Sequence, residues 1–237
     1  MRKRTVVIAC GSILCLGIGT LAVAMPGVAA CALLAAPSFA PLDDGVLVER
    51  QSAAQDRADI PGLLSAARER IATTFGSLRA TPLVAFVHSA DAFWPLQLNA
   101  NASTTFVGSR ACIIVGPKGR SVDVLAHELM HAELAERVGY WRRMTEIPTW
   151  FDEGIAMQVD FRPRYDLPAW RAVQTGDVRK LATAALFYRG SDNERTRHYA
   201  AAKYEVARWL SDAGAPSLYL RLERIRNGEA FDAVLAD

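Results

Sequence analysis

The feature that most limits the fold of this chain is a long segment near its start that carries no charge. Arg2, Lys3 and Arg4 come first, and residues 6–36 then contain no acidic or basic side chain. As a helix, residues 6–24 are long enough to span a bilayer core of about 30 Å. Such a segment at the start of a chain is typical of export signals and membrane anchors, and a buried helix of the domain core fits it poorly.

Three interpretations of this export segment stay open. Secretory signals usually have a shorter apolar stretch, which favours an uncleaved anchor. Ala24 and Ala40 each end a small-residue motif that a signal peptidase could cleave, and residues 28–31 resemble a bacterial lipobox with Cys31 as the lipidated residue. All three place the rest of the chain outside the cytoplasm, because the positive residues at the start remain inside. We therefore expect an exported protein, attached to the membrane or released.

The sequence divides into this signal or anchor, residues 1–40, and one domain of ordinary size, residues 41–237. The chain is 51% hydrophobic and 22% charged, which excludes disordered and fibrous classes. Without the first three basic residues, 24 basic and 25 acidic side chains remain, so we expect no nucleic-acid partner. Cys112 is the only cysteine of the domain, which predicts a small buried core residue and neither a disulfide framework nor a cysteine-based zinc site.

Hydrophobic periodicity predicts a small sheet followed by helices. Strands are predicted at 83–87, 104–108 and 111–115, the last two as a hairpin or as neighbours. Helices are predicted at 60–75, 90–98, 122–138, 149–158, 170–173, 179–186, 195–212 and 217–226. Residues 41–59 are predicted to be a polar connector. This order indicates an α+β fold, with a small mixed sheet over the helix at 122–138, a helical C-terminal part, and a cleft between them.

His127, Glu128 and His131 lie in this predicted helix at a spacing that suits a metal ion. Residues four apart share a helix face, so both imidazoles can reach one ion. Glu128 is one residue along from His127, where such helices hold a carboxylate beside the water on the metal and not on the metal itself. Because the same spacing also arises by chance, the pattern alone is compatible with a solvated amphipathic helix.

Glu153 supplies the third ligand that a catalytic zinc site needs. It follows His131 by 22 residues, enough for a helix end, a reversal and a second helix running back. Its neighbours Trp150 and Phe151 are apolar, and apolar surroundings disfavour an unpaired charge. Gly154 beside it has no side chain and so permits another helix to approach closely. Together these residues predict a site with three protein ligands and one position open to water.

The two motifs together resemble those of the gluzincin zinc metallopeptidases, and in particular the small peptidase-MA-like proteins. The resemblance covers about residues 83–235, and its specific parts are HELMH at 127–131 and PTWFDEGIA at 148–156. It implies an activity that hydrolyses peptide bonds of a peptide or protein substrate. It also implies that Glu128 is the catalytic base and that Zn²⁺ is bound by His127, His131 and Glu153.

In this chemistry, zinc activates a water molecule and polarises the scissile carbonyl. Glu128 takes the proton of the water and passes it to the departing amine. Members of the wider class stabilise the oxyanion with a Tyr or His from a later helix. Tyr199 is our candidate, because it shares an inward helix face with Ala202 and Val206. His198 is the alternative.

Two further features follow from the resemblance. Asp160 lies two helical turns after Glu153, at an acidic position of some gluzincins, and is a candidate partner for His127. Other members place that acid at the position of Met157. The strand at 111–115 resembles the edge strand along which such enzymes bind an extended peptide. The alternative function is an exported, non-catalytic zinc-binding scaffold or adaptor that retains the peptidase fold.

Overall fold

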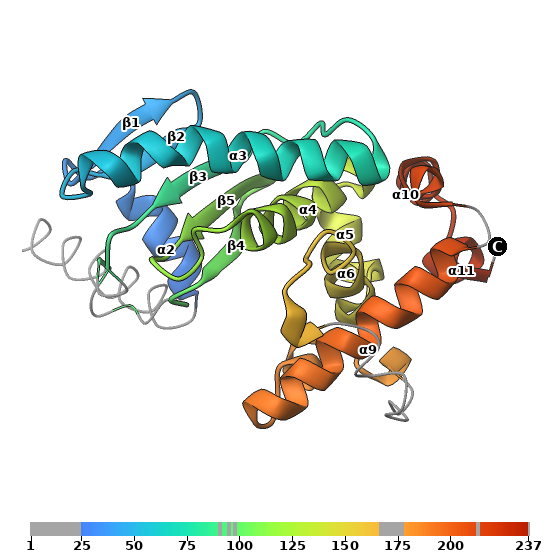
Figure 1. Cartoon of the computed structure of the whole chain (residues 1–237). Coiled ribbons are helices and arrows are strands. Elements are labelled where there is room, and N and C mark those ends of the chain that lie inside the picture. Colours follow the sequence, from blue (N-terminus) through green and yellow to red (C-terminus); the bar gives the residue numbers. More distant parts are fainter. Residues whose placement is uncertain are drawn as a thin grey trace, which may run out of the picture. The chain divides into compact units, whose positions relative to one another are not determined.

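The computed structural model describes residues 25–89, 92–93, 96, 99–165, 178–211 and 214–236 (Figure 1). The chain forms two compact units, which are described separately. The sheet unit comprises Met1–Ala58 and Pro82–Arg120, and the helical unit comprises Asp59–Thr81 and Ser121–Asp237. The predicted α+β class is confirmed, since one unit holds a five-stranded mixed sheet and the other holds helices.

The sheet has the strand order β1-β2-β3-β5-β4. Its inner strands β2, β3 and β5 run parallel to one another, while β1 and β4 pair antiparallel at the two edges. β3 and β5 are apolar and largely buried, as is usual for inner strands. The strands are β1 (Phe39–Asp43), β2 (Val46–Glu49), β3 (Leu83–Phe86), β4 (Ala102–Val107) and β5 (Arg110–Val115).

The predicted hairpin at 104–108 and 111–115 is confirmed, because β4 and β5 pair around Gly108, which has a positive φ of 61°. The prediction that 111–115 is an edge strand is wrong. β5 lies between β3 and β4, and the edge is β4. The predicted connector at 41–59 is also wrong, since it contains most of the β1–β2 hairpin and the start of a helix. These strands are short and flank a polar Asp-Asp-Gly turn, so periodicity gave little signal.

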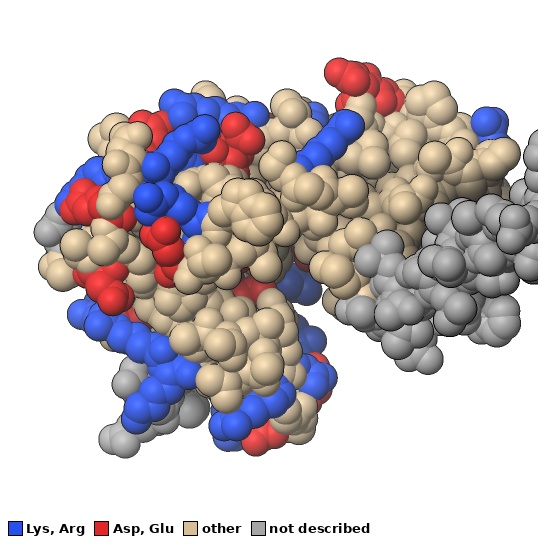
Figure 2. All heavy atoms as spheres, turned by 180° about the vertical axis from the view of Figure 1, so that it is seen from behind, with Lys and Arg blue, Asp and Glu red and all other residues tan. Residues whose placement is uncertain are grey.

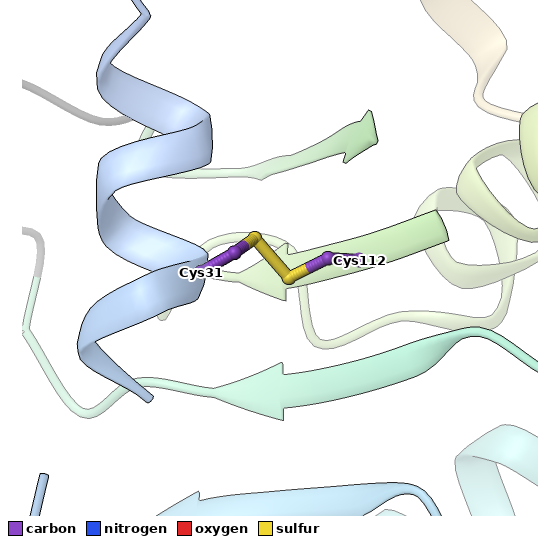
Figure 3. Close-up of a disulfide and its surroundings, with 2 residues drawn as sticks. All are labelled: Cys31 and Cys112. Atoms are coloured by element: carbon purple, nitrogen blue, oxygen red, sulfur yellow. A yellow bond between two sulfur atoms is a disulfide. The ribbon is translucent and has the colours of Figure 1, made fainter. Parts of the chain in front are cut away.

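Helix α2 (Pro26–Leu33) is bonded to the sheet by a disulfide between Cys31 and Cys112, which lies in β5 (Figure 3). Cys112 is buried as predicted, but the expectation of a lone cysteine is wrong. Its partner comes from the segment assigned to export, and packing of α2 on the sheet brings the two Cα atoms within 6.4 Å. Among the described residues, no helix is long and apolar enough to cross a membrane. The predicted span at 6–24 lies outside them.

The helical unit follows the predicted order with few changes. The predictions for α4, α6, α9 and α10 are confirmed, while 179–186 is a 3-10 turn followed by a short helix. The predicted helix at 170–173 lies outside the described residues, as does much of 90–98. The helices are α3 (Ala54–Phe75), which enters this unit at Asp59, α4 (Val122–Val138), α5 (Tyr140–Glu146), α6 (Thr149–Ala156), α8 (Ala184–Phe187), α9 (Asp192–Ser211), α10 (Leu218–Arg226) and α11 (Phe231–Ala236). Turns of 3-10 helix occur at Pro163–Tyr165, Val178–Lys180 and Ala215–Ser217.

Local capping fixes the ends of the helices that matter most for the site. The Ser121 hydroxyl accepts the N–H of Val124 at 3.3 Å, as predicted, and Gly139 ends α4 with a positive φ of 89°. At the start of α9, the carboxylate of Glu194 accepts the N–H of Ser191, and the Ser191 hydroxyl accepts the N–H of Glu194. This reciprocal pair is a capping box, which satisfies two backbone donors.

A buried ionic network holds α4 to the rest of the helical unit. Glu133 is fully buried and accepts the backbone N–H groups of Arg79 and Ala80, each at 2.8 Å. Its other oxygen accepts the Nε of Arg137 at 2.7 Å, and Arg137 also donates to the carbonyl of Ser77. Because a buried carboxylate is tolerated only when it is fully paired, this network fixes the position of α4.

Acidic and basic side chains are interspersed on the face of the molecule shown in Figure 2. Within the helical unit, Arg142 pairs with Glu146 and Arg224 with Glu229. Exposed pairs of this kind contribute about 0–1 kcal/mol each, so they bear on surface charge more than on stability.

Candidate metal centre

The structure brings together the three residues that the sequence predicts as metal ligands. His127 and His131 lie on one face of α4, and Glu153 faces them from α6. His127 Nε2 lies 3.1 Å from His131 Nε2 and 3.3 Å from Glu153 Oε2, while His131 Nε2 lies 3.7 Å from the same oxygen. All three residues are buried. These side chains form the metal group.

The metal group could hold a metal ion. Its three ligand atoms lie within 4.8 Å of one another. Glu153 Oε2 is buried and accepts no hydrogen bond of good geometry from the described residues, and its nearest charged neighbours are the Nε2 atoms of His127 and His131 at 3.3 and 3.7 Å. Leaving a buried carboxylate oxygen without a donor is costly, and a cation between this oxygen and the two imidazole nitrogens would remove that cost.

An aspartate lies beside the other ring nitrogen of each histidine of the metal group, and at His131 the two are hydrogen-bonded. Asp152 Oδ1 lies 2.7 Å from His131 Nδ1, and its second oxygen lies 2.5 Å from the guanidinium of Arg143. A hydrogen bond from Nδ1–H to a carboxylate leaves the lone pair on Nε2, which is the tautomer that binds a metal. Asp152 was not predicted from the sequence, although its position directly before Glu153 in α6 was a usable signal.

Asp160 lies beside His127, as the sequence analysis proposed. Its Oδ2 is 3.5 Å from His127 Nδ1, and the side chain is fully buried. Arg162 Nε donates to both of its oxygens, at 2.9 and 3.0 Å, and Lys203 donates to its backbone carbonyl at 2.6 Å. The two histidines therefore have matched surroundings, in which an arginine holds an aspartate and the aspartate faces the imidazole.

The charges around the metal group favour a cation. Burial alone would lower the pKa of His127, but Asp160 and Glu153 outweigh it and raise that pKa to about 10. For His131, burial is likewise outweighed by Asp152 and Glu153, and its pKa is raised. Burial would raise the pKa of Glu153, but His131 and His127 hold it below its ordinary value. Without a metal, the ionised carboxylates stabilise protons on the two imidazoles. A metal ion competes with these protons for the imidazole nitrogens.

Glu128, the predicted base, is buried on α4 but is not a member of the three-residue metal group. Burial and the charges of Glu153 and Glu128 raise the pKa of Tyr199 well above its ordinary value. The Tyr199 hydroxyl therefore stays protonated and can donate a hydrogen bond. Its ring centroid lies 6.2 Å from that of His127, so the predicted donor is near the metal group.

The predicted role of Gly154 in close helix packing is confirmed, and its partner helix is α9. A Cβ atom at Gly154 would lie 2.5 Å from Val206 Cγ2 and 2.6 Å from the carbonyl oxygen of Ala202. Ala202 and Val206 lie three and seven residues after Tyr199, on the same face of α9. Figure 1 shows α9 passing across α6. The missing side chain of Gly154 thus determines how near Tyr199 comes to Glu153.

A second tyrosine, which was not predicted from the sequence, contacts the metal group directly. Tyr188 follows α8 and donates its hydroxyl hydrogen bond to Glu153 Oε1. Tyr188 as a whole is 42% exposed, but burial around its hydroxyl and the charge of Glu153 raise its pKa, so this donor stays protonated. No spacing rule predicts this contact, because it depends on the path of the chain between α6 and α9. The alternative donor, His198, instead pairs through Nδ1 with the carbonyl of Phe187 at 2.6 Å.

Comparison of the chain with known protein families and with curated proteins gave no match.

Proposed function

We propose that this chain is a gluzincin-type zinc metallopeptidase that hydrolyses peptide bonds. The observation that carries the proposal is the metal group itself, in which a buried Glu153 oxygen without a hydrogen bond from the described residues faces the Nε2 atoms of His127 and His131. Two imidazoles and one carboxylate are a ligand set that suits zinc and leaves a fourth position open. Glu128 lies next to His127 on the same helix.

In this proposal each side chain has a separate task. Zinc, when bound, polarises the scissile carbonyl and makes a water molecule more acidic. Glu128 accepts the proton of that water and delivers it to the departing amine. Tyr199 donates a hydrogen bond to the oxyanion that develops on the carbonyl oxygen. Asp152 and Asp160 keep the two imidazoles oriented.

The substrate class that we propose is a peptide or protein outside the cytoplasm. The apolar N-terminal segment supports export, with the protein either attached to the membrane by this segment or released from it. No nucleic-acid partner is proposed, because the charge without the first three basic residues is nearly balanced.

The test combines metal analysis of the purified full-length chain with a peptide-library assay. We expect about one zinc per chain for the three-ligand site. Glu128→Gln should keep the zinc but lower peptidase activity by about 10²–10⁴-fold, because only the base is lost. Glu136→Gln is the matched control, since Glu136 is exposed on the same helix, and it should leave both readouts unchanged.

Two results would contradict the proposal. A folded wild-type protein that takes up no zinc, even after reconstitution, would exclude a zinc enzyme. A protein that binds zinc through His127, His131 and Glu153 but cleaves no peptide of the library would instead support the alternative function, an exported zinc-binding scaffold or adaptor.

A further inference from the structure

We propose that residues 25–40 are a permanent part of the mature exported protein, and that any cleavage of the export segment falls between Ala24 and Met25. This inference concerns the sheet unit and is independent of the metal group. It rests on the packing of α2, on the pairing of β1 and on the Cys31–Cys112 disulfide.

Helix α2 is packed into the sheet unit and is not a loose leader. A Cβ atom at Gly27 would lie 3.2 Å from the Thr105 Cβ atom, which shows how closely α2 approaches β4. Ala30 and Leu34 are 0% and 4% exposed. They belong to one apolar cluster whose other members include residues of β3, β5 and the segment after β3. These cluster residues are Ala30, Cys31, Leu34, Phe39, Ala85, Val87, Phe93, Cys112 and Ile114.

Cleavage after Ala40 would cut through strand β1. Phe39 is paired with Glu49 and Ala40 with Val48 across the β1–β2 ladder. The Phe39 ring stacks on Phe93 with 5.5 Å between the ring centroids. Removing residues 25–40 would take away the start of β1 and expose the apolar residues that α2 and Phe39 cover.

The Cys31–Cys112 disulfide is incompatible with lipidation of Cys31, because a lipid thioether would need the same sulfur. The disulfide forms when the two thiols lose two protons and two electrons, which a dithiol–disulfide oxidant accepts by thiol–disulfide exchange. Such oxidants act in exported compartments, while the cytoplasm keeps thiols reduced. The disulfide thus gives support for export that does not depend on the apolar segment.

One of the small-residue motifs remains compatible with the fold. Ala22-Val23-Ala24 ends directly before Met25, which is half exposed at the N-terminal end of α2. Hydrolysis there adds one water molecule and leaves a carboxylate on Ala24 and an ammonium group on Met25. If the segment is not cut, it anchors the protein, and the described part of the sheet unit follows it directly in sequence from Met25.

The first experiment determines the N-terminus and the state of the cysteines. The full-length chain is exported from a bacterial host, purified through a C-terminal tag, and examined by N-terminal sequencing and intact mass without reductant. We expect a start at Met1 or Met25, a mass lower by two hydrogen atoms, and protection of Cys31 and Cys112 from alkylation until the protein is reduced and unfolded. A start at Pro41, a lipid on Cys31, or ready alkylation of both thiols would overturn the proposal.

Cysteine variants separate the disulfide from lipidation. Cys31→Ser, Cys112→Ser and the double variant should all melt at the same lowered temperature, because each loses the same bond. If Cys31 were instead a lipid site, Cys112→Ser would melt like the wild type, and Cys31→Ser would lose the lipid. Zinc content is the internal control. Zinc content tests the metal group of the helical unit, whereas the N-terminus and the cysteine state test the sheet unit. Failure of this proposal and failure of the peptidase proposal therefore give different results.

Discussion

At the scale of single residues, the three members of the metal group are positioned by the side chains behind them. Asp152 is hydrogen-bonded to His131, Asp160 lies beside His127, and an arginine pairs with each aspartate. Tyr188 performs a similar task for Glu153, since it binds Oε1 and leaves Oε2 facing the imidazoles. Such supporting contacts determine how little a site must rearrange when its ion binds.

Removing the Tyr188 hydroxyl should weaken zinc binding. We expect Tyr188→Phe to raise the zinc dissociation constant by about 10–100-fold, as is common when a partner of a metal ligand is lost. Competition with a chromogenic chelator measures this constant directly. Tyr204→Phe, an exposed tyrosine on α9, is the control and should bind like the wild type.

A double-mutant cycle shows whether Tyr188 acts through Glu153. In a Glu153→Ala background, Tyr188→Phe should have no further effect on zinc affinity, because there is no carboxylate left to orient. Equal losses in both backgrounds would mean that Tyr188 acts on the fold in general.

The metal-free protein should become less stable as the pH rises from about 6.5 to about 10. The pKa of His127 is 6.5 in an ordinary setting, and in the fold Asp160 and Glu153 outweigh burial and raise it to about 10. The folded state therefore binds this proton more tightly, and the resulting stability is complete below pH 6.5 and lost as the pH approaches 10. Thermal unfolding with excess chelator measures this slope. His127→Gln should flatten it, and an unchanged slope would contradict the assignment.

At the scale of secondary-structure elements, the contact between α6 and α9 sets the geometry around Glu153. The helices touch where Gly154 meets Ala202 and Val206. Because α9 also carries Tyr199, a small change in the distance between these helices moves the candidate donor relative to the metal group.

Gly154→Ala should destabilise the protein by about 2–3 kcal/mol, because the added methyl group would clash with the Ala202 carbonyl oxygen and with Val206. Urea unfolding measures the change. Gly62→Ala is a matched control in α3, where a Cβ atom meets nothing within 4 Å, and it should stabilise the helix by about 0.5–1 kcal/mol. If both substitutions changed the free energy of unfolding in the same direction, close packing would not explain the glycine at 154.

The sequence predicted correctly several features that depend on a single helix. The spacing of His127 and His131 follows from helix geometry, and the long periodic helices α4 and α9 were predicted with nearly correct ends. It did not predict two contacts between different secondary-structure elements. The contact of Tyr188 with Glu153 and the bond of Cys31 to Cys112 depend on tertiary packing, and no local pattern encodes them. The short strands β1 and β2 have too few residues to show a period.

At the scale of the whole molecule, zinc should act as a stabilising ligand. At a free concentration of about 1,000 times the dissociation constant, mass action adds about 4 kcal/mol to the free energy of unfolding. For a protein of this size, that raises the melting temperature by roughly 10 °C. Differential scanning calorimetry with zinc and with chelator measures the shift. Glu153→Ala should abolish most of it, and the same shift in that variant would place the ion elsewhere.

The disulfide also gives the chain a topology that its strand order does not show. The bond joins residues separated by 81 positions, so the backbone from Cys31 to Cys112 forms a covalent ring. Strands β1 to β4 and helix α3 all lie on this ring. A protease that cuts one exposed loop of the ring linearises it without releasing a fragment, whereas a single cut after Cys112 separates two pieces. A loop cut between Cys31 and Cys112 would therefore stay invisible on a non-reducing gel and appear only after the disulfide is reduced.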